Sequence, residues 1–423
     1  MTPERISPAP LPNPTGGAPR PPAAECCGRF GLQSEATPEG PCSRDRSRYD
    51  PVGSRGRSQS DRSGFGWLAI LVFPIGASVT TAPLSVAIVG FGRIGRVHAQ
   101  HLREHPSARL SAVVDPQVPA GSPPEVPEFD SLEALLSRGP SIQAAVVASP
   151  TALHREHVQA LVEANVRVMV EKPLTANFEE DEQFADWLQV RHPKSVMLAF
   201  QRRFDGPLLR LQSWLKEGRI GRPFKFVSIL EDSRLMPAGY ESPGLLQDMS
   251  VHNVDELLWL AESDPISVRA QGHQLFSQAH SPVVEDYDDA SLELSFEDGS
   301  IGQIFVSRNH VAGYRVESWV YGEAGLIHVG AFRQNRHEVT LECYGVDGEG
   351  SRERFPTRDY GAGVPEFLER FGEAYAGELD HFVQACLSGV AFRVGPQDAR
   401  RASRVLAAAA KAVQTGEVHR WPD

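Results

Sequence analysis

Short apolar segments alternate with longer stretches of mixed polarity between residues 84 and 200. Short apolar runs separated by helical stretches are typical of buried parallel strands in βαβ units. We therefore expect the folded part of the chain to open with a parallel α/β sheet. The expected strands lie at 86–89, 110–114, 144–148, 166–170 and 196–200.

A polar or turn residue follows three of these strands. Ser149 and Pro150 follow the third, Glu171 and Lys172 follow the fourth, and Gln201 follows the last. Ligands of open α/β sheets bind beyond the carboxyl ends of the strands. These residues should therefore border one crevice.

The pattern changes after about residue 203, where strands follow one another directly. Neighbouring strands of this kind indicate a largely antiparallel sheet. We expect a second, α+β domain over residues 203–423, after a first domain over 84–202. Its expected elements are helices at 207–216, 246–262, 373–387 and 396–414 and strands at 224–230, 290–296, 301–307, 315–321, 326–329 and 339–344.

Composition supports two packed domains and excludes some partners. The chain has 423 residues, of which 41% are hydrophobic and 23% charged, which is enough for two cores. A net charge of −12 provides no basic surface for nucleic acid. Three of the five cysteines lie before residue 84, so the folded part has no disulfide framework. We therefore expect a cytoplasmic protein without nucleic-acid or membrane partners.

Residues 1–83 differ in composition from the rest of the chain. They contain 13 prolines, 10 glycines and no lysine, and such a segment buries too little apolar surface to offset its chain entropy. The apolar stretch 65–75 is too short to span a bilayer. The segment is interpreted as disordered or as an artefact of the assigned start, with a signal-like segment as the alternative.

A glycine-rich turn follows the first expected strand, and its sequence is Gly90, Phe91, Gly92, Arg93, Ile94 and Gly95. In a dinucleotide-binding turn, the first glycine permits the tight turn, the second admits a pyrophosphate, and the third allows close packing of the helix. Asp115 ends the next strand, where its carboxylate can bind ribose hydroxyls and repel a 2′-phosphate. No arginine or lysine stands beside Asp115, so NAD is favoured over NADP.

Lys172 is the first of only five lysines among 42 basic residues. It follows an apolar strand, so its ammonium should emerge at the crevice. Because the chain uses arginine almost everywhere else, this lysine is interpreted as chosen for its chemistry.

A second group of polar residues lies on the helix expected at 246–262. At 100° per residue, Asp248, His252 and Asp255 share one face. Flanking carboxylates would stabilise protonated His252 and orient its ring, as suits a general base for a hydroxyl proton. The alternative is a solvated polar face with a helix cap at Asp248. No metal is expected, because no cysteine lies near in sequence and hydride transfer needs only the cofactor.

The chain resembles the glucose-fructose oxidoreductase, inositol dehydrogenase and rhizopine-catabolism (Gfo/Idh/MocA) family over about residues 84–420. Its other matching motifs are Ser149-Pro150-Thr151 with His154, Glu171-Lys172-Pro173, and Asp248-x-x-x-His252 with Asp255. The resemblance implies a Rossmann domain followed by an open-faced sheet domain. It also implies a homodimer or homotetramer formed through that sheet.

The resemblance further implies roles for individual residues. Lys172 would lie between nicotinamide and substrate, and Asp248 and His252 would hold and deprotonate the reacting hydroxyl. The remaining positions implied are Ser149, Pro150, Thr151, His154 and Glu171 at the cofactor and Gln201, Arg202 and Asp255 at the substrate. The sequence departs from the family at Ser242-Pro243-Gly244, which replaces a glycine triplet, and at residues 231–234.

These features together predict an NAD-dependent oxidoreductase that interconverts a secondary hydroxyl and a ketone on a sugar or cyclitol. Two alternatives stay open: an NAD-using glycosidase, and a catalytically silent cofactor-binding sensor. The combined presence of Lys172, Asp248 and His252 argues against the sensor.

Overall fold

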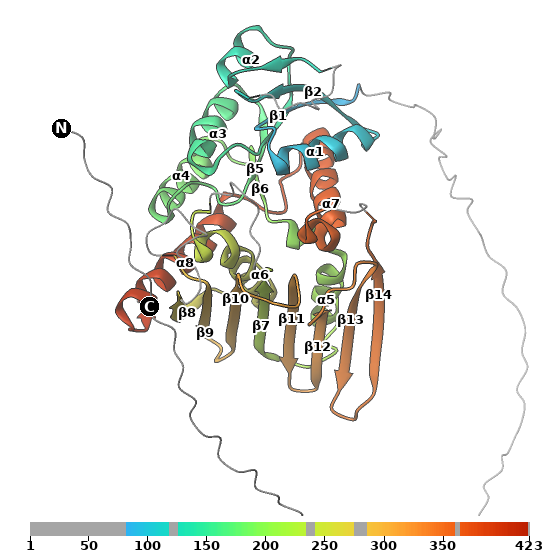
Figure 1. The fold of residues 1–423 in the computed structure, drawn as a ribbon, viewed down its shortest axis with the longest axis vertical. Helices are drawn as coiled ribbons and strands as arrows, with labels where there is room; N and C mark the ends of the chain where they lie inside the picture. The colour runs from blue at the N-terminus through green and yellow to red at the C-terminus, as the bar shows by residue number, and fades with distance from the viewer. Residues whose placement is uncertain (1–81, 118–125, 234–241, 275–285, 360–363, 422–423) are drawn as a thin grey trace, which may run out of the picture. The chain divides into compact units, whose positions relative to one another are not determined.

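The computed structural model describes residues 82–117, 126–233, 242–274, 286–359 and 364–421. The segment 1–83, with its apolar stretch at 65–75, falls almost entirely outside the described residues. Within these residues the chain forms two sheets with their helices (Figure 1).

The first sheet has six parallel strands in the order β3-β2-β1-β4-β5-β6. Strands β1, β4 and β6 are buried along their whole length, as the continuous apolar runs predict. The strand order reverses between β1 and β4, because β2 and β3 lie on one side of β1 and the later strands lie on the other. Doubly wound folds bind dinucleotides at this point of the sheet. The strands are β1 (Leu84–Val89), β2 (Ala108–Val114), β3 (Glu128–Phe129), β4 (Ala144–Val147), β5 (Arg167–Glu171) and β6 (Val196–Ala199).

Helices cover this sheet and continue into the second half of the chain. The helices are α1 (Arg93–Glu104), α2 (Leu132–Arg138), α3 (His154–Glu163), α4 (Phe178–Arg191), α5 (Gly206–Lys216), α6 (Val251–Ala261), α7 (Glu366–Ser388) and α8 (Pro396–Thr415). Two short 3₁₀ turns, η1 (Thr151–Leu153) and η2 (Gln201–Phe204), follow β4 and β6, and the π-helical turn η3 (Leu246–Ser250) precedes α6.

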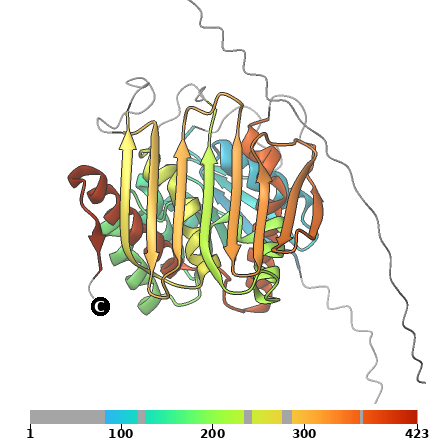
Figure 2. The same ribbon diagram turned by 90° about the horizontal axis from the view of Figure 1, so that it is seen from below.

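The second sheet has nine strands in the order β14-β13-β12-β11-β7-β10-β9-β8-β15. All neighbours are antiparallel except β7 and β10, so the expectation of a largely antiparallel sheet is confirmed. Helices cover one face, and the other face is open in Figure 2. The strands are β7 (Pro223–Glu231), β8 (Pro265–His273), β9 (Asp289–Phe296), β10 (Ile301–Ser307), β11 (Arg315–Gly322), β12 (Gly325–Ala331), β13 (Glu338–Gly345), β14 (Gly350–Pro356) and β15 (His419–Arg420).

The two closing helices belong to both halves of the molecule. Helix α7 packs against α1 and β1 of the first sheet, and α8 packs against α4 as well as α6 and β8. Arg167 at the start of β5 donates to the carbonyl oxygen of Ala385 in α7. The last two helices therefore pack against elements on both sides of the boundary expected near residue 203.

Candidate active site

The turn after β1 has no room for side chains at two of its glycines. Gly90 has a φ of 92°, and a Cβ atom there would lie 2.4 Å from the backbone nitrogen of Ser149. A Cβ atom on Gly95 would lie 2.0 Å from the carbonyl oxygen of Gly90. The steric roles expected of these two glycines are confirmed. Gly92 caps α1 and faces open space, so a ligand can approach the first amides of the helix.

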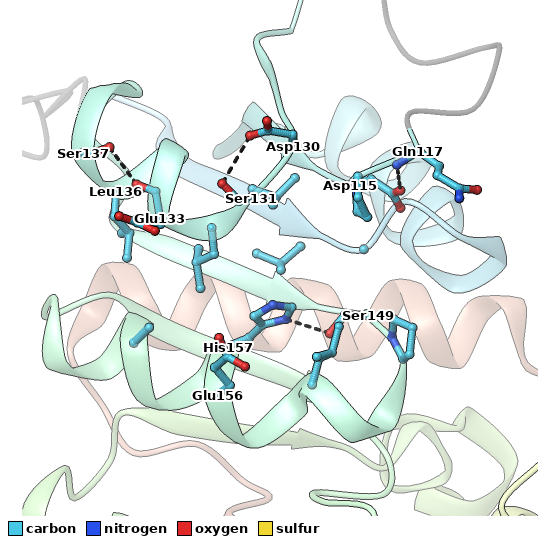
Figure 3. Close-up of a pocket in the computed structure, with 18 residues that line it drawn as sticks. Asp115, Gln117, Asp130, Ser131, Glu133, Leu136, Ser137, Ser149, Glu156 and His157 are labelled. Carbon is cyan, nitrogen blue, oxygen red and sulfur yellow. Dashed lines mark hydrogen bonds between the residues drawn. The ribbon is translucent and has the colours of Figure 1, made fainter.

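A cavity of about 860 Å³ opens beside this turn, at the carboxyl ends of β1, β2 and β4 (Figure 3). Asp115 lies on its wall with both carboxylate oxygens held by backbone amides. Oδ2 accepts from Phe91 at 2.7 Å and Oδ1 accepts from Gln117 at 2.8 Å. The ring of Phe91 is itself buried, so Phe91 reaches the site only through its backbone. These bonds fix Asp115 at the cavity edge.

The wall of this cavity is acidic. Among the described residues that line it, four carry carboxylates, Asp115, Asp130, Glu133 and Glu156, and none is an arginine or lysine. Only Asp115 could be identified from the sequence, because the other three come from α2, α3 and the loop before α2, where spacing gives no signal. A phosphate dianion would meet repulsion from this wall. The structure therefore favours an unphosphorylated ribose.

Some residues of the loop after β4 line the cavity, and others are buried in the interior. Ser149 and Pro150 line the cavity, and Ser149 Oγ lies 2.9 Å from Nδ1 of His157. Thr151 begins the short turn η1. His154 is buried, and its two ring nitrogens face the carbonyl oxygens of Pro173 at 2.8 Å and Ser149 at 2.9 Å. His154 thus ties together the loops after β4 and β5 and does not reach the cavity.

Glu171 likewise has an internal partner. Its carboxylate accepts from Nε2 of His98 in α1 at 2.8 Å, and only 8% of the residue is exposed. The carboxylate that the sequence places at the cofactor thus links β5 to α1, because the strand turns this side chain into the sheet-helix interface.

Lys172 projects from the end of β5 toward the second half of the chain. Its Nζ donates to Asp248 Oδ1 at 2.9 Å and to the Asp248 carbonyl oxygen at 3.0 Å. The side chain is 18% exposed, so the ammonium remains accessible from the crevice. Lys172 and Asp248 lie 76 positions apart in the sequence, and both were expected at the site. The structure brings them into contact.

The helical face expected around His252 is wrong in one respect. Residues Leu246–Ser250 form a π-helical turn, and the regular helix α6 begins only at Val251. A π turn holds more residues per turn than an α-helix and occurs often at functional sites. Its wider turn breaks the 100° spacing between Asp248 and the residues of α6. Asp255, which shares the regular helix with His252, pairs with Arg203.

Asp255 and Arg202 form ion pairs in the interior. Asp255 is 1% exposed and accepts two bonds from Arg203 Nε and one from Nη2. Arg202, also 1% exposed, pairs with Glu256 at 2.6 Å. Gln201 is buried beside them in η2. Arg202 and Asp255, both expected at the substrate, thus have their charges paired within the protein, as buried charges require.

The surroundings of His252 lower its pKa well below 6.5. Burial is the main cause, and the positive charges of Lys172 and Arg202 add to it, while Asp248 opposes them. Among the described residues, His252 Nδ1 has no hydrogen-bond partner. The expectation that carboxylates raise this pKa is therefore wrong. His252 is a neutral imidazole at neutral pH, which is the form that accepts a proton.

Two further residues lie close to Asp248. Ser242 Oγ donates to Asp248 Oδ2 at 3.1 Å. Burial, followed by the nearby charges of Glu366 and Asp248, raises the pKa of Asp232 at the end of β7. The sequence signal for both was the departure from the family pattern at 231–234 and 242–244, which marked the segments without assigning a role.

The strand order, the glycine turn, the acidic ribose wall and the Lys172–Asp248 pair together define a dinucleotide-dependent oxidoreductase. Two family models match the chain: an oxidoreductase family with an NAD-binding Rossmann fold over residues 84–200, and a Gfo/Idh/MocA C-terminal domain over 208–328. The chain therefore belongs to the Gfo/Idh/MocA family of NAD-dependent oxidoreductases.

Several relatives carry inositol dehydrogenase names. The scyllo-inositol 2-dehydrogenase (NAD(+)) of Bacillus subtilis is 29% identical over 316 residues, which cover 72% of this chain and 86% of the relative. The inositol 2-dehydrogenase of Rhizobium meliloti is 29% identical over 77% of this chain and 96% of its own length. The crystal structure of a putative myo-inositol dehydrogenase from Sinorhizobium meliloti has a TM-score of 0.66 at 27% identity, covering 80% of this chain and 99% of that one.

No group of three or more His, Cys, Asp or Glu side chains in the described ranges is arranged to hold a metal ion. None of the helices in those ranges is both long and apolar enough to cross a membrane.

The acidic wall predicts how cofactor preference can be changed. The double variant Asp115→Ser and Gln117→Arg removes the carboxylate that repels a 2′-phosphate and adds a guanidinium that can bind one. We expect NADP affinity to rise about tenfold or more relative to NAD, as charge-assisted hydrogen bonds allow. Titration of both cofactors by tryptophan fluorescence measures the ratio. A wild-type protein that already binds NADP more tightly would contradict the role of Asp115.

Proposed function

We propose that the protein oxidises a secondary hydroxyl of a cyclitol or sugar to a ketone, with NAD as the hydride acceptor, and catalyses the reverse reduction. The observation that carries this proposal is the contact of Lys172 Nζ with Asp248, with neutral His252 on the following helix. This contact joins the strand end of the NAD-binding fold to the first turns of the second domain.

The described residues fit NAD along the crevice. The open amides at the start of α1 can bind the pyrophosphate, and Asp115 can accept hydrogen bonds from the adenosine ribose. The Ser149 loop forms the opposite wall of the cavity. NAD, when bound, supplies the acceptor for the hydride that leaves the substrate carbon.

The residues around Lys172 divide the remaining work. The Lys172 ammonium would hold the reacting oxygen and stabilise the negative charge that develops there as its proton leaves. His252, being neutral, would accept the hydroxyl proton. Asp248 holds Lys172 in place through two contacts. Loss of a hydride from carbon and a proton from oxygen turns the alcohol into a ketone.

The substrate class is inferred from the relatives. The two curated relatives described above are named for inositol oxidation, and they align over most of this chain. A polyhydroxylated ring also suits a site that presents an ammonium, an imidazole and carboxylates. The proposal is therefore the class of substrate, a cyclitol or a sugar.

The proposed substrate class is tested by a screen for NADH formation. Absorbance at 340 nm is followed with NAD and, in turn, cyclitols, aldoses and amino sugars. We expect net NADH with at least one cyclitol or sugar. Release of a glycosidic leaving group without net NADH would identify an NAD-using glycosidase instead, and NAD binding without turnover of any compound would favour a sensor.

Self-association through the open face of the second sheet is also proposed. Phe305 of β10 and Tyr344 of β13 are 41% and 42% exposed, and Trp319 of β11 stacks on His328 on the same face. Aromatic residues on a broad sheet face are typical of protein interfaces. We expect a dimer or tetramer by sedimentation velocity. The cytoplasmic location expected from the cysteine content stays a prediction.

A further inference from the structure

The departure from the glycine triplet at residue 242 has a structural counterpart. Ser242 lies just before η3, is 3% exposed, and places its Oγ atom 3.1 Å from Asp248 Oδ2. Asp248 Oδ1 accepts from Lys172 at 2.9 Å. The two oxygens of the Asp248 carboxylate therefore face different donors, one from each half of the chain.

The direction of the Ser242 hydroxyl proton is fixed by its other partners. Arg308 Nη2 donates to Ser242 Oγ at 2.6 Å, and the backbone N–H of Gly244 donates to the same atom at 3.2 Å. A hydroxyl has two acceptor lone pairs and one proton. With both lone pairs engaged by donors, the proton is left for Asp248 Oδ2. The hydroxyl thus donates to the carboxylate.

Arg308 is held in turn by Asp286. The two side chains form a close ion pair, and both are at most 6% exposed. Asp286 Oδ1 also accepts from the backbone N–H groups of Leu245 at 2.6 Å and Tyr287 at 2.9 Å. Arg308 follows strand β10, and Asp286 precedes strand β9. A rigid part of the second sheet therefore anchors the chain of hydrogen bonds that ends at Asp248.

We propose that Ser242 is a positioning residue for the Lys172–Asp248 pair, orienting the carboxylate through a hydroxyl that Arg308 and Asp286 hold in place. The inference rests on the proposed function of Lys172 but concerns a residue outside the reacting groups. A glycine at 242 has no atom to make this bond. With the bond, Ser242 holds Asp248 Oδ2 while Oδ1 accepts from the ammonium. Without it, Oδ2 loses a donor that is itself held in place, and the carboxylate orients Lys172 less tightly.

The first test reads Lys172 directly and needs no substrate. The full-length protein with NAD bound is treated with a trace of acetic anhydride at fixed pH, and acetylation of Lys172 is measured by mass spectrometry against Lys194 in the same sample. We expect Ser242→Ala to raise the relative labelling of Lys172 about tenfold, because a hydrogen bond to a charged group is lost. Unchanged labelling would overturn the proposal.

Three further variants distinguish a positioning role of Ser242 from a role in folding. Ser242→Thr keeps the hydroxyl and should label like wild type, whereas Ser242→Val has nearly the same shape and should label like the alanine variant. Ser403→Ala is the matched control: Ser403 is also a buried serine that donates to a buried carboxylate, that of Asp181. It should leave Lys172 labelling unchanged. Equal labelling in the threonine and valine variants would overturn the proposal even if the alanine variant unfolds.

The second test uses turnover of whichever compound forms NADH. We expect Ser242→Ala to lower kcat about tenfold with little change in KM, because the hydroxyl touches neither substrate nor cofactor, and Ser242→Thr to restore kcat. An increase in KM alone would overturn the positioning role. If no compound is oxidised, the proposed function fails while the labelling result still decides the role of Ser242.

Discussion

Replacement of Lys172 by arginine is expected to lower kcat by about a hundredfold or more while NAD affinity stays nearly unchanged. The ammonium fits between the Asp248 carboxylate and the Asp248 carbonyl oxygen, 2.9 and 3.0 Å away. A guanidinium is larger and planar and cannot occupy this compact position with the same geometry. The expected loss falls within the range for removal of one preorganised electrostatic donor.

The measurement separates binding from chemistry. NAD affinity is determined by fluorescence titration, and kcat with the compound that gives most NADH. Lys225→Arg serves as the matched control, since Lys225 lies over the Tyr321 ring on the second sheet, outside the site, and should tolerate the exchange. An Lys172→Arg enzyme that keeps most of its kcat would show that Lys172 provides only diffuse positive charge, and its catalytic role would then be withdrawn.

Replacement of His252 by alanine is expected to lower kcat by about a hundredfold and to remove the acid limb of the oxidation profile. Burial and the charges of Lys172 and Arg202 lower the pKa of His252 well below 6.5. A histidine with a lowered pKa is neutral, and able to accept a proton, at every pH above that value. Activity of the wild type should therefore fall only as the pH drops below 6.5.

The pH dependence of kcat for oxidation, measured for wild type and variant, checks this sign. His337→Ala, at an exposed position, is the control and should reproduce the wild-type profile. An acid limb centred above pH 6.5 in the wild type would mean that carboxylates dominate the surroundings of His252. A variant that retains the same limb would remove His252 from the role of base.

The parallel sheet was predictable because its signals are local. Apolar runs of strand length followed by turn residues placed β1, β2, β4, β5 and β6 to within a few residues. The glycine turn was equally readable, since a positive φ at Gly90 and the tight packing of Gly95 leave room for no other residue. Lys172 could be selected because a polar residue after a buried strand must emerge at the sheet edge.

The second sheet was less completely predicted. Strands β8, β14 and the two-residue β15 were missed, and α7 begins at Glu366, earlier than expected. Strand β14 contains mostly polar and charged residues and is a strand because β13 supplies its hydrogen-bond partners. Strand β8 begins at a proline, a position that a strand permits, so its pairing with β9 is consistent with its sequence. For β14, pairing across the sheet overrode the local signal.

The sequence by itself determined the family, the cofactor, the nucleotide-binding turn and the identity of the lysine, because each depends on residues close together in the chain. Only the tertiary structure decided the surroundings of the candidate site residues. Asp255 pairs with Arg203 in the interior, and burial together with nearby positive charges reversed the expected pKa shift of His252. Charge, burial and hydrogen-bond partners are properties of the folded surroundings, so a pattern of spacing along one helix could not supply them.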